Sequence, residues 1–572
     1  MGNKDTARRP SGGSSGNLLV VVAVVVLGAM TLSSYAGGDD APSLEAEAKA
    51  RQQLAEVAKL NMELAGVEAS RDAALASRDE ALLLASTPAA APPAAAAPPP
   101  AAAAPPPRPP AAAPPPPPPR RPTDAPPANG YGGYTFWSSD FHISPIADLK
   151  DIFNPMGMTI IDESLSGHCH LKKTCSKDLK VITKQNGIDL GRCPNKLRRQ
   201  FFETYKRDAR LRGVDAFLCH HAAGLCEVFM PFNASLVVVA STRYEIGRHD
   251  AGRWRAWNEN LKAIAAHPRN VVAANNRYDA EYVKYFTGLK DVPVLPNYCG
   301  YTGATYAPAR NQILVGPGRG VSNELFGMLR KAADRRRGAC KTSAANKALC
   351  GGGGSFDFRR IRDLYPHFEY SDLAAHPAVV LIPYQVSIMS IFEYYRMGIP
   401  MFAPHPNLMA KWQLKYRVMS ERTWDLVRHK GRPSKRSALP QAPGGTYPHD
   451  PNDEFDEDAI AWWIKFADFY EWPHIETFDS FDDLLDKLAS PDLDLARASR
   501  NVRAYNKQMV DDLATTWQGL FHKMFHGLKP ARDAPKDQLL DYDAAMLAKY
   551  GAAPSGCVGD AHSQRPSDWL AL

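Results

Sequence analysis

The residue pair best suited to chemistry follows the first apolar segment of the globular part. Asp140 and His142 come directly after the predicted strand 134–139. Ligands of open α/β sheets bind outside the carboxyl ends of strands, so both side chains are expected in a cleft. Imidazole titrates near neutral pH, and a nearby carboxylate can orient it. The pair is thus suited to acid–base chemistry, with Asp140 placed to orient the imidazole. The alternative is that Asp140 and Ser144 are turn and capping residues.

A further acidic residue, Glu393, lies in an apolar frame. Segment 379–404 reads VVLIPYQVSIMSIFEYYRMGIPMFAP. The pattern predicts a buried strand, a turn, a short helix that carries Glu393, and a second strand after Gly398. A carboxylate is costly to bury unless something binds it, and the hydroxyl pair of a nucleotide ribose is a suitable partner. The alternative is a carboxylate that interacts with the helix dipole.

A glycine-rich turn follows the predicted strand 312–315. The turn reads Gly-Pro-Gly-Arg-Gly and contains Gly318 and Arg319. Backbone amides of such a turn can approach a diphosphate, and the arginine can supply positive charge. The turn lacks both the dinucleotide fingerprint and the lysine of a phosphate-binding loop.

Polar residues also follow other predicted strands. Arg243 and Arg248 could pair with a phosphate or an acidic acceptor, although one of them could instead bridge to Glu245. Asn276 and Asn297 could read sugar hydroxyls, although asparagine is also a common turn residue. Their shared place at strand ends favours one rim of a cleft.

The segment around Glu393 resembles the donor site of GT-B glycosyltransferases. In that superfamily a helix glutamate, followed by glycine at the fifth and proline at the seventh position, bonds the nucleotide ribose. Ser387 stands in the small-residue turn that holds the phosphates. Gln385 stands where many retaining members have a second glutamate. The resemblance implies a donor site built from Glu393, Ser387, Gln385, Arg319 and Gly318.

The residues around His142 are similar to the start of inverting UDP-sugar transferases, in which the matching histidine is the general base. The two resemblances disagree on stereochemistry, which stays open. No Asp-x-Asp pair marks a metal site, and the acidic run 453–458 is interpreted as a solvated loop. We therefore expect no cofactor, with the nucleotide-sugar as a substrate and metal-independent transfer.

The expected fold is α/β, with two doubly wound, Rossmann-like domains that face a cleft, as in GT-B enzymes. Strand and helix patterns alternate, which favours parallel sheets. The predicted strands are 134–139, 158–162, 216–219, 236–240, 270–274, 292–295, 312–315, 368–370, 379–382, 401–403 and 474–478. The predicted helices include 196–211, 254–266, 280–287 and a returning C-terminal helix at 495–520.

Composition divides the 572 residues further. An uncharged apolar stretch follows Lys4, Arg8 and Arg9, which predicts a membrane anchor with a cytoplasmic N-terminus; a cleaved signal peptide is the alternative. An Ala/Glu-rich helical stem and a disordered Ala/Pro-rich linker come next. The predicted divisions are a tail at 1–17, an anchor at 18–38, a stem at 39–87, a linker at 88–129, an acceptor domain at 130–305, a donor domain at 306–527 and an irregular tail at 528–572.

The nine cysteines suit an oxidising compartment. Eight could form bridges, and Cys557 would be left over; a zinc site at His168, Cys169, His170 and Cys175 is the alternative. Asn233 begins a glycosylation sequon. A net charge of +7 is small for this length and does not mark a nucleic-acid binder.

These features together predict a single-pass Golgi membrane protein with a lumenal catalytic head. It would transfer a hexosyl or pentosyl group from a nucleotide-sugar donor to a hydroxyl of a glycan or glycoprotein. The stem could form a homodimer. An exostosin-like polysaccharide acceptor is one subcase. The alternatives are a non-catalytic glycan-binding or scaffold protein on a stalk, and a sulfotransferase, whose phosphosulfate-binding turn is missing after the first strand.

Overall fold

The computed structural model describes residues 130–166, 169, 175–176, 178–183, 194–241, 251–318, 320–336, 349, 354–422, 434–533 and 542–550. The chain divides into two units, Met1–Pro116 and Pro117–Leu572, and the fold described below belongs to the second. The predicted tail, anchor, stem and linker lie outside the described residues. Among those that are described, no helix is both long and apolar enough to cross a bilayer.

The first sheet contains five parallel strands. They are β1 (Thr135–Ser138), β2 (Thr159–Asp162), β3 (Ala216–Cys219), β4 (Ser235–Ala240) and β5 (Val271–Ala274). Their spatial order is β2-β1-β3-β4-β5. The central strands β3 and β4 are buried along their whole length, as expected for a parallel sheet with both faces covered.

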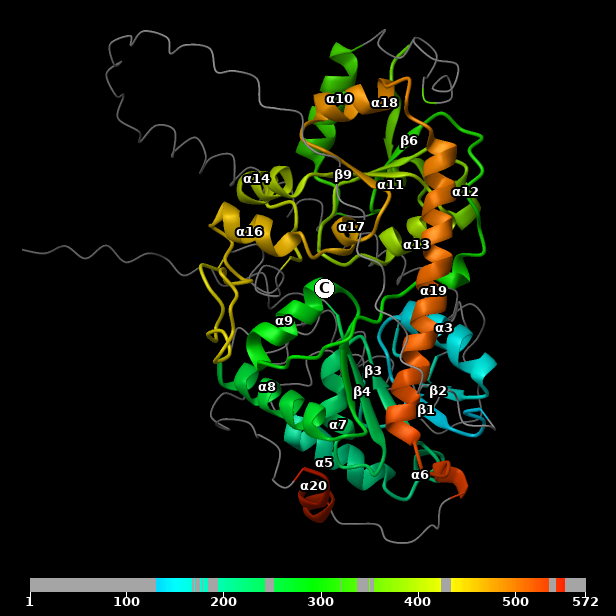
Figure 1. Ribbon diagram of the computed structural model, residues 1–572, viewed down its shortest axis with the longest axis vertical. Coiled ribbons are helices and arrows are strands. Elements are labelled where there is room, and N and C mark those ends of the chain that lie inside the picture. The colour runs from blue at the N-terminus through cyan, green and yellow to red at the C-terminus, as the bar shows by residue number, and fades with distance from the viewer. Residues whose placement is uncertain are drawn as a thin grey trace, which may run out of the picture. The chain divides into compact units, whose positions relative to one another are not determined.

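Helices cover both faces of this sheet (Figure 1). Phe136 of β1 packs against Phe153, the last residue of α3 (Ile143–Phe153), with ring centroids 5.0 Å apart. Its neighbour Trp137 points to the opposite face and meets Tyr205 of α5 (Pro194–Tyr205) at 6.4 Å. The alternation follows from the two-residue period of a strand. The other helices of this half are α6 (Ala209–Arg212), α7 (Cys226–Phe229), α8 (Ala251–Ala266) and α9 (Arg277–Thr287).

The second sheet repeats the topology of the first. Its parallel strands are β6 (Ile313–Gly316), β7 (Phe358–Arg360), β8 (Val379–Leu381), β9 (Met401–Pro404) and β10 (Ile475–Phe478), in the order β10-β9-β8-β6-β7. In each sheet the first strand lies between the second and the third. The strand order therefore reverses between β1 and β3, and again between β6 and β8, which are the expected ligand-binding positions of a doubly wound sheet. The helices of this half are α10 (Asn323–Arg335), α11 (Ile361–Leu364), α12 (Tyr370–Ala374), α13 (Met389–Met397), α14 (Pro406–Tyr416), α16 (Glu457–Ile464), α17 (Asp468–Glu471) and α18 (Phe481–Ala489).

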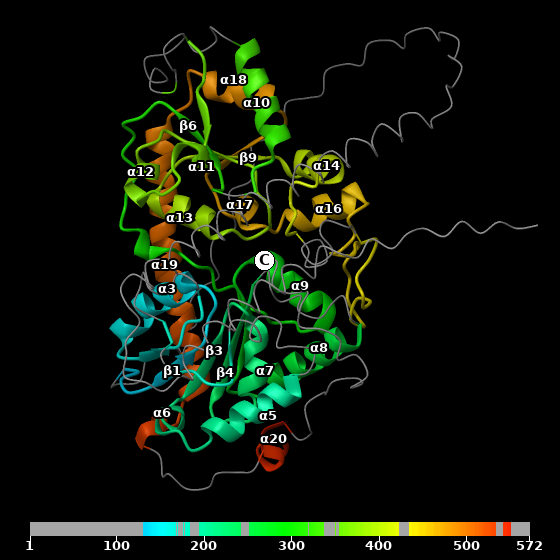
Figure 2. The same ribbon diagram turned by 180° about the vertical axis from the view of Figure 1, so that it is seen from behind.

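The predicted returning helix is confirmed as α19 (Leu495–Phe525), which runs beside both sheets (Figures 1 and 2). In the second half, Asn506 of α19 accepts a hydrogen bond from Arg396 of α13 at 2.8 Å. In the first half, Phe525 stacks on Tyr134 with ring centroids 4.3 Å apart. The single helix thus belongs to the cores of both halves.

Nine of the predicted strands are confirmed to within about two residues, and two are wrong. Segment 292–295 makes only an isolated bridge between Val294 and Ala274, because the flanking Pro293 and Pro296 have no N–H group for a ladder. Segment 368–370 instead enters α12, where Glu369 and Asp372 form a capping box. Strand β7 was not predicted, since its sequence is the short, charged Phe-Arg-Arg.

The predicted solvated acidic loop at 453–458 is also wrong in part. Glu454 is fully buried, and its Oε1 accepts a hydrogen bond from Arg422 Nε at 2.9 Å. Its Oε2 accepts another from Gln413 at 2.9 Å. A buried carboxylate is tolerated because it is paired in this way. Asp456, in contrast, caps α16.

The predicted irregular tail contains helix α20 (Tyr542–Tyr550). It packs on α5, where the guanidinium of Arg199 lies 4.2 Å from the ring centroid of Tyr542. Lys549 donates a hydrogen bond to the carbonyl oxygen of Phe232 at 3.1 Å. Helix α20 therefore packs against the first half of the fold.

The described cysteines form two disulfides, Cys169–Cys175 and Cys219–Cys226, and Cys299 is a buried free thiol. Because Cys169 and Cys175 bond to each other, they are not available as zinc thiolates. His168, His170, Cys193, Cys340, Cys350 and Cys557 lie outside the described residues. Within the described part of the chain, no three His, Cys, Asp or Glu side chains are placed so that together they could hold a metal ion.

Candidate functional site

Most of the predicted site residues that the structure describes lie at two places, one at the carboxyl ends of the strands in each sheet. Asp140 and His142 follow β1, and the adjacent strand β3 is followed by His220 and His221. In the second sheet, Gly318 follows β6, and the turn 383–387 follows β8. Each group lies where the strand order of its sheet reverses.

Asp140 joins the two loops at the first of these places. Its Oδ1 accepts the backbone N–H of His142 at 2.7 Å, and its Oδ2 accepts the backbone N–H of His221 at 2.9 Å. Burial raises the pKa of Asp140 to about 7, although these hydrogen bonds lower it. Asp140 therefore positions the loops through their backbones, and its predicted role as orienter of the His142 ring stays a prediction.

Three histidines gather at this place. The half-buried His142 and His221 have ring centroids 6.2 Å apart. His220 is fully enclosed, and burial, with a smaller effect of His142, lowers its pKa to about 3. His220 and His221 were missed at the sequence level, although the rule that selected Asp140 would have found them directly after strand 216–219.

A disulfide closes the loop that carries these histidines. Cys219 is the last residue of β3, and Cys226 is the first residue of α7. The bond encloses only the six residues between them. His220 and His221 are thereby held at the end of the sheet.

Asn275 and the predicted site residue Asn276 are both buried and have different partners. Asn275 Oδ1 accepts hydrogen bonds from Asn297 N at 3.2 Å and from Asn297 Nδ2 at 3.0 Å. Asn276 caps α9, where its Oδ1 accepts from Asp279 N at 2.8 Å and its Nδ2 donates to Asp279 Oδ2 at 2.7 Å. Both polar atoms of Asn276 are thus used within the helix cap. Arg243, Arg248 and Arg319 lie outside the described residues.

The two sheets meet at Ser387. Asn275 Nδ2 donates to Ser387 Oγ at 3.4 Å, and Ser387 also hydrogen-bonds Asp468 at the start of α17. Burial raises the pKa of Asp468 well above its usual range, and the Ser387 bond lowers it. The predicted residue Gln385 lies two positions before Ser387, and its Nε2 donates to Tyr384 OH at 3.2 Å. Asp468 was not among the predicted site residues, because its neighbours Phe466, Phe469 and Tyr470 are aromatic and indicate core packing.

Glu393 is bound by two tyrosines. Its Oε1 accepts from Tyr301 OH at 2.9 Å and from Tyr370 OH at 2.8 Å. Burial raises the pKa of Glu393, and the two hydroxyl groups lower it, with Tyr370 the stronger. The carboxylate does have binding partners, as its apolar frame required, but they come from the protein. Its contact with a ribose stays a prediction.

Several buried polar atoms at these strand ends have no hydrogen-bond partner within the described chain. Buried groups of this kind are normally satisfied by water or a ligand. They are Ser138 Oγ, Ser241 Oγ, both ring nitrogens of His220, Gln385 Oε1 and Asp468 Oδ2. The side chain of Asn275 lies close to the His220 ring and raises its pKa, but the two do not meet at the distance and angle of a hydrogen bond.

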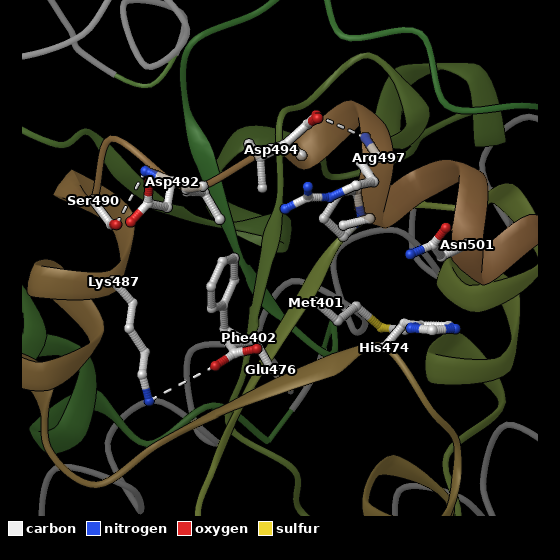
Figure 3. Close-up of a pocket in the computed structure, with 14 residues that line it drawn as sticks. Met401, Phe402, His474, Glu476, Lys487, Ser490, Asp492, Asp494, Arg497 and Asn501 are labelled. Carbon is white, nitrogen blue, oxygen red and sulfur yellow. Dashed lines mark hydrogen bonds and ion pairs between the residues drawn. The ribbon is translucent and has the colours of Figure 1, made fainter. Parts of the chain in front are cut away.

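A separate cavity of about 340 Å³ lies at the opposite edge of the second sheet (Figure 3). Its wall includes Met401 at the start of β9, Glu476 of β10 and Arg497 of α19. Lys487 lies on its rim, 3.9 Å from Glu476 and 3.0 Å from Asp483. This cavity contains none of the predicted site residues, and it is at the amino ends of the strands.

No family model and no curated protein match the sequence. Similar solved structures include a glycotransferase of kitacinnamycin, with 12% identity, a TM-score of 0.32, and coverage of 69% of this chain and 99% of that one. The glycosyltransferase SnogD from Streptomyces nogalater has 11% identity, a TM-score of 0.31, and coverage of 68% and 100%. The spinosyn rhamnosyltransferase SpnG has 12% identity, a TM-score of 0.27, and coverage of 67% and 100%. These three similar structures are described as sugar transferases.

Proposed function

We propose that the chain is a glycosyltransferase that moves a sugar from a nucleotide-sugar donor to a hydroxyl group of a glycan or glycoprotein. One observation carries the proposal. The Asn275–Ser387 hydrogen bond joins the loop after β5 of the first sheet to the loop after β8, at the strand-order reversal of the second sheet, and several buried polar atoms at the carboxyl ends of the two sheets have no partner within the described chain. A polar ligand of two parts, one for each sheet, suits such a site.

The residues of the second sheet would bind the donor. The turn that contains Gly318 would approach the diphosphate, with Arg319 supplying charge. Ser387 and Gln385 would bond the phosphates or the sugar, and Glu393 the ribose. The sequence resemblance supports these roles, as does the place of the turn and of Ser387 at the carboxyl ends of β6 and β8.

The residues of the first sheet would act on the acceptor. His142 would take the proton of the acceptor hydroxyl as its oxygen bonds to the anomeric carbon. The bond from that carbon to the diphosphate breaks, and the nucleoside diphosphate leaves with the electron pair. The half-buried ring of His142 beside the buried histidine loop supports this role.

We further propose that the enzyme is a type II membrane protein of the Golgi, anchored by 18–38, with its head in the lumen. The basic residues before the apolar stretch support this orientation. The two disulfides support an oxidising compartment. The stem would allow a homodimer.

A donor panel tests the proposed activity. The detergent-solubilised full chain is heated with UDP- and GDP-sugars, each alone and together with glycan acceptors. One donor should stabilise the protein by about 2.7 kcal/mol at a hundredfold excess over its Kd. Sugar transfer to the acceptor should follow with that donor. Stabilisation by glycans alone, with no response to any nucleotide-sugar, would identify a stalked glycan-binding protein instead.

A further inference from the structure

The chain between β5 and β6 connects the two sheets. Its residues 298–302, called the link below, are held by one carboxylate from the first half and one from the second. On the first side, Asp148 of α3 accepts the backbone N–H groups of Tyr298 at 3.0 Å, Cys299 at 2.9 Å and Gly300 at 3.0 Å. On the second side, Glu393 of α13 accepts the hydroxyl of Tyr301, the next residue. Four consecutive link residues are thus fixed between α3 and α13.

The two tyrosines on Glu393 come from different elements. Tyr301 lies in the link, in the 3-10 helix Gly300–Thr302, whereas Tyr370 is the first residue of α12 in the second half. Both donate to Oε1. A carboxylate can accept further hydrogen bonds at its other oxygen, so the tyrosines do not exhaust the acceptor capacity of Glu393.

The hydroxyl groups also favour the charged form of Glu393. Among the described residues, the titratable groups on which its charge acts are Cys299 and Tyr301 from the link, Tyr370 from α12 and Tyr394 from its own helix; the cation Arg396, also on α13, acts on Cys299. None of these four is a cation, so the hydroxyl donors compensate the buried carboxylate. Loss of one donor raises the pKa of Glu393 further.

We propose that Tyr301 is a positioning residue of the donor site, which holds the Glu393 carboxylate from the link and makes the link respond to donor binding. The inference rests on the proposed function, because it takes the nucleotide ribose as the second partner of Glu393. A ribose that bonds Oε2 pulls on the same carboxylate that holds Tyr301. Donor binding therefore changes how rigidly the link is held. Because Asp148 bonds the link amides, the change in mobility extends to α3.

The test compares Tyr301→Phe with Tyr370→Phe, which removes a hydroxyl from the same oxygen but leaves the link contact intact. Each change should weaken binding of the nucleotide-sugar by about tenfold, since each removes one hydrogen bond to a charged group. In each variant the acidic limb of donor affinity against pH should move to higher pH, because a larger fraction of Glu393 is protonated there. A purely structural tyrosine would leave this limb in place.

Hydrogen exchange of residues 298–302 separates the two variants. Saturating donor should slow the exchange of these amides in the wild type and in Tyr370→Phe. In Tyr301→Phe the donor should no longer slow it. Equal donor-dependent protection in both variants, or none in the wild type despite donor binding, would overturn the inference. If Tyr301→Phe does not fold, Glu393→Gln should likewise weaken donor binding and link protection. A wild type that binds no nucleotide-sugar would instead refute the proposed function.

Discussion

The side-chain amide of Asn275 donates to the hydroxyl of Ser387 at 3.4 Å and joins the carboxyl ends of the two sheets. These residues are 112 positions apart in the chain. The same amide accepts two hydrogen bonds from Asn297. The buried side chain of Asn275 thus connects the loops after β5 and β8 with Asn297, the residue just before Tyr298.

Replacing Asn275 by Ala should lower both stability and turnover. The buried N–H groups of Asn297 lose their acceptor, which costs about 1–3 kcal/mol. Urea unfolding measures this loss, and single-turnover assays measure the activity. Asn276→Ala is the matched control: it should cost about 1 kcal/mol as a lost helix cap and leave turnover unchanged. Reduced turnover in the control would support Asn276 as an acceptor-site residue.

His142→Ala should reduce turnover by about 10²–10⁴-fold, the usual contribution of a general base. Calorimetric donor affinity should stay near that of the wild type, because the donor is assigned to the other sheet. Turnover at the wild-type rate would remove His142 as the base.

Opening the disulfide beside the histidines should reduce turnover more than it reduces the affinity for the donor. Closing a loop of this size stabilises a fold by about 2.5 kcal/mol in the chain-entropy description. Cys226→Ser should therefore lower the free energy of unfolding by a similar amount and release the loop of His220 and His221. Cys175→Ser, which opens the other described disulfide, is the comparison. If both variants lose turnover equally, the effect is not specific to the histidine loop.

Asp140 should make stability fall as pH rises. Its pKa in the folded protein is about 7, above the value of about 3.9 for an unfolded chain, so folding favours the protonated form. This contribution is fully present below the unfolded value and is lost as pH rises through about 7. Urea unfolding between pH 4 and 8 should show a steeper decline for the wild type than for Asp140→Asn. Parallel curves would contradict the assigned burial of this carboxyl.

Much of the local structure could be predicted from the sequence because strands and helices have distinct periods. Strand 216–219 matches β3 residue for residue, and 379–382 extends one residue beyond β8. Strand β7 could not be found in this way, since Phe-Arg-Arg at a sheet edge has neither a buried run nor an alternation. Charge alone also misplaced Glu454, whose partner Arg422 lies 32 residues away.

The site was predictable only in its strand-end positions. Asp140 and His142 were selected because they follow an apolar strand, and His220 satisfies the same rule. Ser387 was selected because its turn resembles the GT-B donor site. The contacts that decide their roles are long-range. No local pattern indicates that Asn275 meets Ser387, or that Tyr301 and Tyr370 meet at Glu393, because these pairings depend on how the two halves pack.

Helix α19 has a consequence for how the protein is made. Its residues Trp517 and Phe521 pack on Phe153, with ring centroids 4.9 and 4.8 Å away, and Phe521 also meets Phe136 of the first strand. The first half therefore lacks part of its core until the end of the chain has been synthesised. Domains usually fold in the order in which they emerge from the ribosome. Here the first half must wait for the last long helix, with its aromatic surface exposed to chaperones during translation.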